Sequence, residues 1–393
     1  MSQIPKLRYK YSCIEKESDA ILLIIEHETS NSYLHCSSEV IDIIELIDGK
    51  KNIKEINDIL NKKNILLTEE ELSDIINNRL RRLTSLKQSD DKKPVHYLYF
   101  NFTIINKKHV KKIATILAFI FKNQNFVLFS FILFIVLSAT LLYSYTQTFT
   151  ITSQSIFTIP LILLVTLFFH EIGHATACYS YGAENGDIGF GFYLLTPVMY
   201  ADVTDVWKLP RKERFIVDIA GLYMEGLIVT LLSIVYWLTK SEILIYTTIV
   251  IIINTFINLN PFLRFDGYWM LSDITNIYNL KSVSNKRLME LVRLQNLKLK
   301  ARDLFLILYA SLSLLFLLWF IFYVSYYRFM DLIHFPENCY TFISEWIVNQ
   351  KSNVSFWQIS IPIGFYYLII NKSKLLIKLL QSKLSHEKFK SAI

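Results

Sequence analysis

The sequence predicts a polytopic α-helical membrane protein of about six transmembrane helices, preceded by a small α+β domain of winged-helix-like arrangement. Hydrophobic residues make up 52% of the 393 residues and aromatic residues 15%, a composition typical of a chain with a large membrane-embedded part. Long apolar runs match the thickness of a bilayer. The first 88 residues differ, because short apolar segments there alternate with charged residues and polar turns.

Six apolar runs are long enough to cross a membrane. They lie near residues 126–146, 156–181, 214–238, 243–270, 303–327 and 355–371. We therefore expect four parts, which are an amino-terminal domain (1–88), a linker with a basic interfacial segment (89–125), a six-span domain (126–371) and a basic cytosolic tail (372–393).

The connections between these runs alternate in positive charge. Segment 146–155 has no lysine or arginine, whereas segments 183–214 and 272–302 and the tail are rich in them. The positive-inside rule then predicts a multi-pass protein of the cell (inner or plasma) membrane with both termini in the cytoplasm. The same distribution accounts for the net charge of +7, so we expect the lipid bilayer and no nucleic acid as a partner.

The second run contains the motif His170-Glu171-Ile172-Gly173-His174. Histidines four residues apart on a helix project from one face, so both imidazoles can bind one zinc ion. Glu171 is then the candidate general base for a water molecule on the metal. Ionisable residues inside an apolar span are costly, and this setting favours a functional site over satisfied core histidines.

A third metal ligand is expected at the inner end of the fourth run, where Asp266 lies at a depth similar to the two histidines. Zinc sites that act on water use three protein ligands and keep one position open. The alternative is that Asp266 pairs with Arg264 at the membrane boundary. Pro261 and Gly267 predict a broken or bent helix beside Asp266.

These residues resemble the site-2 protease family of intramembrane zinc metalloproteases (M50-type). The resemblance rests on HEIGH in one span and on the segment NLNPFLRFDGYWMLSD, which begins at Asn258, two spans later. It implies zinc bound by His170, His174 and Asp266, with Glu171 as catalytic base. Asn258, with Asn260 nearby, would bind the substrate, unless these amides serve only helix packing.

Three further features near the motif are open to two interpretations each. Glu225 is an intramembrane carboxylate whose partner is not readable, at a place where the family usually has a glycine-proline-x-x-asparagine pattern. Cys178 follows His174 by four residues and either faces the metal or packs as a small residue. Segment 186–205 is expected to be extended, either as an edge that holds an unwound substrate or as an interfacial loop.

The amino-terminal domain is expected to contain a hairpin (20–28 and 31–35) and three helices (38–47, 52–62 and 69–86). Ser37 or Ser38 can cap the first helix, and Thr68 with Glu71 forms a capping box for the third. This order resembles the PqqD-like peptide-recognition domain. The resemblance implies that a precursor's leader segment binds as an added strand between 31–35 and 69–86, although a folding or docking role stays open.

We therefore expect an intramembrane zinc metalloendopeptidase, with Zn²⁺ as cofactor, that processes a ribosomally synthesised precursor peptide during leader removal or a maturation and export step. A peptide-modifying enzyme or transporter is a further expected partner. One alternative is regulated intramembrane proteolysis of a membrane-anchored regulator. The other is a peptide exporter or immunity protein on the same scaffold without proteolysis.

Overall fold

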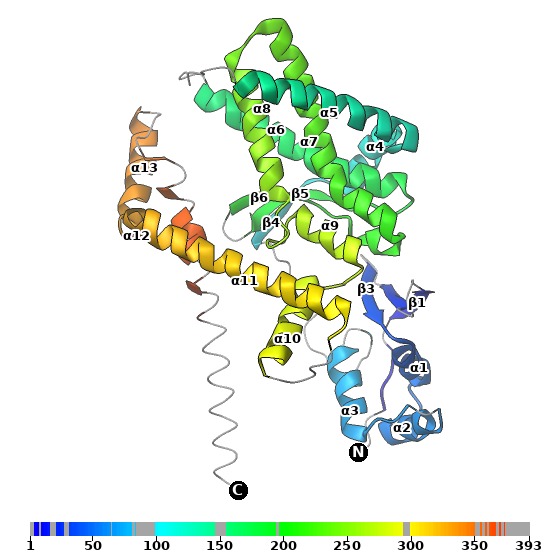
Figure 1. Cartoon of the computed structure of the whole chain (residues 1–393). Coiled ribbons are helices and arrows are strands. Elements are labelled where there is room, and N and C mark those ends of the chain that lie inside the picture. Colours follow the sequence, from blue (N-terminus) through cyan, green and yellow to red (C-terminus); the bar gives the residue numbers. More distant parts are fainter. Residues whose placement is uncertain are drawn as a thin grey trace. The chain divides into compact units, whose positions relative to one another are not determined.

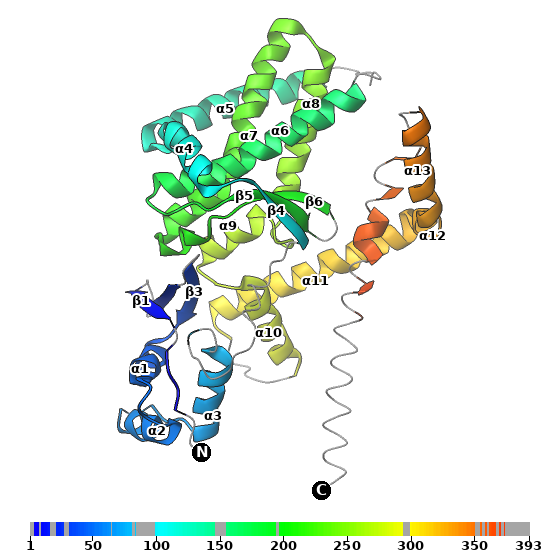
Figure 2. The same ribbon diagram turned by 180° about the vertical axis from the view of Figure 1, so that it is seen from behind.

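The computed structural model describes residues 4–7, 9–15, 21–26, 31–63, 65–80, 83, 99–145, 155–193, 196–293, 299–349, 354–355, 358–359, 361–366, 369–370 and 373. The chain divides into two compact units (Figures 1 and 2). Unit 1 comprises residues 1–96 with 204–210, and unit 2 comprises residues 97–203 with 211–393. The predicted boundary near residue 88 and most of the predicted tail lie outside the described residues.

Unit 1 contains a three-stranded antiparallel sheet and three helices. The strands β1 (Lys10–Glu15), β2 (Ile21–Glu26) and β3 (Asn31–Cys36) lie in the order β1-β2-β3. The helices are α1 (Ser38–Leu46), α2 (Ile53–Lys62) and α3 (Glu69–Asp74). Side chains from the sheet and all three helices share one apolar core, which includes Leu23, Ile44, Ile56 and Leu72. Unit 1 thus has a core of its own.

The predicted hairpin corresponds to β2 and β3, and the structure adds β1, which was not predicted. β1 pairs with β2 along its whole length. The predicted third helix is shorter than expected. It changes at Ile75 into a π-helical turn, Ile75–Arg79, in which the Leu80 amide donates to the Ile75 carbonyl at 2.8 Å.

Unit 2 is built mainly from long apolar helices. They include α5 (Asn123–Tyr145), α6 (Ser155–Ser180), α7 (Arg211–Thr239), α8 (Glu242–Asn258) and α11 (Ala301–Tyr327). Among the described residues, three helices are long and apolar enough to cross a membrane, at 158–180, 211–239 and 301–327. The other three predicted spans stay predictions, and that at 355–371 lies partly outside the described residues.

The predicted fourth span does not run through to residue 270. Helix α8 ends at Asn258, and α9 (Asp266–Thr275) begins after an irregular segment that contains Pro261. A β-carbon at Gly267 would lie 2.1 Å from the backbone oxygen of Leu259. Glycine is therefore required where the new helix passes the end of the old one, and the predicted break is confirmed.

A second antiparallel sheet packs against one end of α6. It consists of β4 (Tyr99–Ile105), β5 (Ile188–Tyr193) and β6 (Thr196–Ala201), in the order β4-β5-β6. Helix α4 (Lys107–Leu117) lies beside α6 in Figures 1 and 2. Val110 of α4, Ile172 of α6 and Ile188 of β5 share a buried cluster. The extended segment predicted after the HEIGH span is therefore confirmed.

Further helical elements of unit 2 are the 3₁₀ turn Ala118–Phe121, α10 (Leu280–Val292), α12 (Phe329–Ile333) and α13 (Phe335–Asn349). Residues 361–366 are also helical. Tyr268 of α9 packs with Leu280 of α10 and with Tyr309 of α11 in one cluster. This cluster anchors the helix that begins at Asp266.

Candidate metal centre

Three residues with metal-binding side chains meet inside unit 2. His170 and His174 lie one turn apart on α6, and Asp266 is the first residue of α9. One ligand atom from each lies within 4.8 Å of the others, so the cluster can hold a metal ion. Both histidines are buried and the Asp266 side chain is 20% exposed. The distance of 96 residues between Asp266 and His170 is bridged by the fold.

The distances between these atoms fit a tetrahedral zinc site. His170 Nε2 lies 3.1 Å from His174 Nε2 and 3.0 Å from Asp266 Oδ2, while His174 Nε2 lies 3.6 Å from Asp266 Oδ1. Ligands about 2.0–2.1 Å from a tetrahedral zinc ion lie roughly 3.3 Å apart. The two carboxylate oxygens of Asp266 therefore face the two imidazoles, as ligands of one cation would.

Helix α7 leaves room for the two imidazoles at Gly221. A β-carbon at this position would lie 2.4 Å from His174 Nε2 and 2.5 Å from His170 Nε2. Neither approach is possible for a real side chain. At Gly173, between the histidines, a β-carbon would meet the Ala220 carbonyl oxygen at 2.5 Å. Glycines on both helices therefore allow α6 and α7 to pack closely at the cluster.

The other ring nitrogen of each histidine faces α7. His174 Nδ1 lies 2.7 Å from the Val217 carbonyl oxygen, to which it donates as N–H. His170 Nδ1 lies 3.1 Å from Glu225 Oε1. A proton on Nδ1 leaves the Nε2 lone pair free for a metal, and such partners commonly orient histidine ligands. Both Nε2 atoms indeed face Asp266.

Glu171 lies at the same cluster and contacts the second sheet. Its carboxylate accepts a hydrogen bond from the backbone of Ala201, the last residue of β6, and interacts electrostatically with both histidines and Asp266. The residue that follows the first histidine is thereby held between the metal-binding atoms and an edge strand. A carboxylate in this position can accept a proton from water bound beside the histidines.

The segment before Asp266 is fixed by neighbouring helices. Tyr309 of α11 donates its hydroxyl to the Pro261 carbonyl at 2.8 Å, and Lys281 of α10 donates to the Phe262 carbonyl at 3.1 Å. Asn260 Oδ1 accepts the Phe262 amide at 2.9 Å. These contacts order irregular backbone that an apolar surrounding would otherwise leave unpaired.

A buried ion pair joins α9 to α7. Arg214, which is 2% exposed, donates through Nε to Asp273 Oδ1 at 2.9 Å, and its NH2 atom also lies 2.9 Å from this oxygen. Asp273 follows Asp266 by seven residues, two turns along α9. Arg214 likewise precedes Gly221 by seven residues on α7. The ion pair therefore helps to fix how α7 and α9 are aligned along each other at the metal centre.

The structure gives different roles to the remaining candidates. Asn260 holds the turn after α8, and Asn258, the last residue of α8, is half-buried. Cys178 is buried, and its Sγ lies 3.7 Å from the Glu184 carbonyl oxygen, so its packing interpretation fits better than metal binding. Gly221 was not among the predicted site residues, and the partner of Glu225 could not be predicted. The only sequence signal for Glu225 was a carboxylate within an apolar run.

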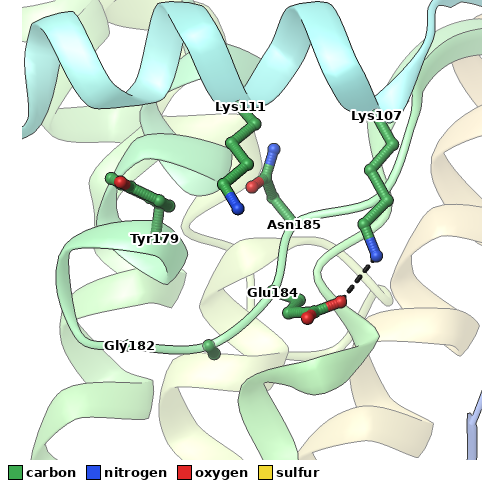
Figure 3. Close-up of a pocket in the computed structure, with 7 residues that line it drawn as sticks. Lys107, Lys111, Tyr179, Gly182, Glu184 and Asn185 are labelled. Atoms are coloured by element: carbon green, nitrogen blue, oxygen red, sulfur yellow. Dashed lines mark hydrogen bonds and ion pairs between the residues drawn. The ribbon is translucent and has the colours of Figure 1, made fainter.

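A separate cavity of about 230 Å³ lies between α4 and the segment that follows α6 (Figure 3). Lys107 of α4 pairs there with Glu184 at 2.6 Å. Lys111 and Asn185 extend toward each other in the same view. None of the metal-binding residues lines this cavity, whose walls are Lys107, Lys111, Tyr179, Gly182, Ala183, Glu184 and Asn185.

Comparison with known proteins identifies a distant relative. Over 116 residues the chain is 28% identical to the "Putative peptide zinc metalloprotease protein YydH" of Bacillus subtilis (strain 168). The match covers 29% of this chain and 46% of that relative, so the chain aligns with about half of its length. No protein-family model and no solved structure matches the chain. The relative's name agrees with a zinc protease.

Proposed function

We propose that the protein is an intramembrane zinc metalloendopeptidase in which His170, His174 and Asp266 hold the metal and Glu171 is the catalytic base. One observation carries this proposal, namely that three metal-binding side chains and one further carboxylate converge in the interior of apolar helices. Such a cluster is costly in a membrane unless it has a function. The name of the distant relative supports the same chemistry.

The residues of the chain would divide the reaction between them. Zinc, when bound, supplies Lewis-acid activation of water and of the peptide carbonyl. Glu171 takes a proton from the attacking water and returns it to the leaving amine, for which its carboxylate must face the metal-binding atoms. His170 and His174, with Nδ1 turned toward α7, present the Nε2 lone pairs. Asp266 supplies the third ligand and a negative charge.

The substrate is proposed to bind as an extended strand along β6. This strand lies at the edge of the sheet β4-β5-β6, and its last residue donates to Glu171. A helical substrate must unwind before its backbone can be cleaved, and a sheet edge offers main-chain hydrogen bonds to the unwound chain. Asn258 and Asn260 are further candidates for substrate contacts, although Asn260 Oδ1 is already engaged with Phe262.

The physiological substrate is proposed to be a ribosomally synthesised precursor peptide whose leader binds unit 1. In the sheet β1-β2-β3 the strand β3 lies at an edge, where a leader segment can add as a fourth strand. Capture of the precursor by unit 1 would raise its effective concentration at the metal centre in the same chain.

The test of the enzyme is Glu171→Gln in the intact protein. This variant keeps the shape of the side chain and removes the base, so trimming of a candidate precursor in cells should be lost while zinc remains bound. Cys178→Ser, near the motif but away from the metal, is the matched control. Normal trimming by Glu171→Gln would refute proteolysis and favour a peptide exporter or immunity protein on this scaffold.

The test of recognition uses the intact protein and a labelled leader peptide. Saturable binding that is lost when the leader's extended segment is interrupted by proline would support strand addition, since proline removes a main-chain donor. Absence of saturable binding would contradict the proposal that unit 1 binds the leader of a precursor peptide. A membrane-anchored regulator would then be the substrate to test next.

A further inference from the structure

Glu225 is a carboxylate beside the metal centre for which the proposed reaction has no use. Its side chain is fully buried, at 0% exposure, in the middle of α7. A buried charge without compensation costs several kcal/mol in a protein interior, and more partners are needed where lipid surrounds the helices. The contacts of Glu225 show what compensates it.

Both carboxylate oxygens of Glu225 are engaged by different helices. Oε1 lies 3.1 Å from His170 Nδ1 on α6 and 3.4 Å from Asn254 Nδ2 on α8. Oε2 accepts the Thr255 hydroxyl at 2.6 Å, also from α8. The carboxylate is therefore held from one side by α8 and faces the imidazole on the other. These contacts with α6 and α8 fix the position of the Glu225 carboxylate.

We infer that Glu225 is a positioning residue that fixes the orientation and tautomer of His170 and thereby tunes the affinity for the metal. This inference rests on the proposed zinc site. A proton on His170 Nδ1, which lies 3.1 Å from Glu225 Oε1, leaves Nε2 unprotonated toward Asp266 and His174. A carboxylate in this position also makes the imidazole a stronger ligand.

The two histidines have different partners at Nδ1. Glu225 lies one imidazole away from the candidate metal-binding nitrogen of His170. His174 has no carboxylate at Nδ1, because the Val217 carbonyl occupies that place.

The inference is tested by metal affinity in the intact, detergent-solubilised protein, with a chromophoric chelator competing for zinc. Glu225→Leu should lower the zinc affinity by about 10- to 100-fold, the usual cost of losing such a partner. Glu225→Gln keeps an acceptor and removes the charge, so its loss should be smaller. The absorption spectrum of bound Co²⁺ should change in both variants, because the imidazole of His170 is a weaker or reoriented ligand.

Two threonines of α8 provide a matched pair of milder variants. Thr255 and Thr247 both donate their hydroxyl to the carbonyl four residues earlier, but Thr255 also reaches Glu225. Thr255→Val should weaken zinc binding and alter the Co²⁺ spectrum, whereas Thr247→Val should change neither. This comparison remains informative if Glu225→Leu does not fold.

The outcomes separate the inference from the proposed function. Wild-type zinc affinity and an unchanged Co²⁺ spectrum in Glu225→Gln and Thr255→Val would overturn the role of Glu225 alone. If His170→Ala together with Asp266→Ala also left zinc binding unchanged, the metal centre itself would be refuted. Weakened binding in the Glu225 and Thr255 variants, with an unaffected Thr247 variant, would establish the positioning role.

Discussion

Gly221 lies so close to His174 that a β-carbon on it would be 2.4 Å from the Nε2 atom. The same β-carbon would be 2.5 Å from His170 Nε2. The space for both Nε2 atoms of α6 thus depends on the absence of a side chain at Gly221 of α7. A single methyl group there would meet ring atoms of two residues that are themselves held at Nδ1 by α7.

We expect Gly221→Ala to abolish zinc binding while the helices still form. The rings cannot retreat without breaking their contacts with Val217 and Glu225, so the ligand geometry should be lost. Zinc content of the purified protein is the measurement. Gly226→Ala, on the same helix, is the control, because its β-carbon would meet only the end of the flexible Leu133 side chain. Stoichiometric zinc in Gly221→Ala would contradict the site.

Removing one partner of the ion pair between Arg214 and Asp273 should lower the free energy of unfolding. Arg214→Met removes the buried cation that pairs with Asp273, and we expect a loss of about 3–5 kcal/mol in the free energy of unfolding. Replacing both partners with apolar residues should recover part of this loss. Arg211→Met, an exposed change three residues earlier, should stay within about 0.5 kcal/mol of the wild type. Equal stabilities of Arg214→Met and Arg211→Met would contradict the prediction.

Removal of zinc should lower the stability of unit 2. Without a cation, the Asp266 carboxylate and two imidazoles whose Nε2 atoms are 3.1 Å apart lose the ion that they would share. Ligand linkage predicts a gain of about 4 kcal/mol when free zinc exceeds its dissociation constant by about a thousandfold. Thermal unfolding against free zinc measures this. His170→Ala should show little dependence on zinc, and a dependence equal to that of the wild type would argue for a different binding site.

The capping box of α3 should make the stability of unit 1 depend on acid pH. Glu71 accepts the Thr68 amide and hydroxyl, each at 3.0 Å, which holds the pKa of Glu71 below its usual value of 4.5. A carboxyl with a lowered folded-state pKa stabilises above the unfolded pKa and loses this effect as pH falls through the folded pKa. Glu71→Gln should therefore flatten the loss of stability below about pH 4.5 in residues 1–96.

Urea unfolding followed by circular dichroism at several pH values measures this change. The neighbouring Glu70→Gln is the control, and it should retain the wild-type slope. Thr68→Ala, which removes the cap, should cost about 1 kcal/mol at neutral pH. A wild-type pH dependence in Glu71→Gln would show that other carboxylates determine the acid unfolding of unit 1.

Local patterns predicted most of the described helices and strands and the three residues of the candidate metal centre, but not β1. The spacing of His170 and His174 follows from the helical repeat, because an apolar run of that length forms one helix. The capping box at Thr68 and the break between α8 and α9 are equally local, since each depends on residues that are neighbours in sequence. Asp266 could be predicted only with a further inference. The alternating charge of the connections between the apolar runs predicted its depth in the membrane.

The tertiary structure alone decided which residues support these ligands. Glu225, Gly221 and Arg214 act through α6, α8 and α9, so their roles depend on how each helix is rotated about its axis. A helix that is apolar all round has no polar face to reveal that rotation. Sequence therefore determined which atoms can bind the metal, and helix packing determined how they are oriented, because the contacts between helices are set by side-chain fit rather than by periodicity.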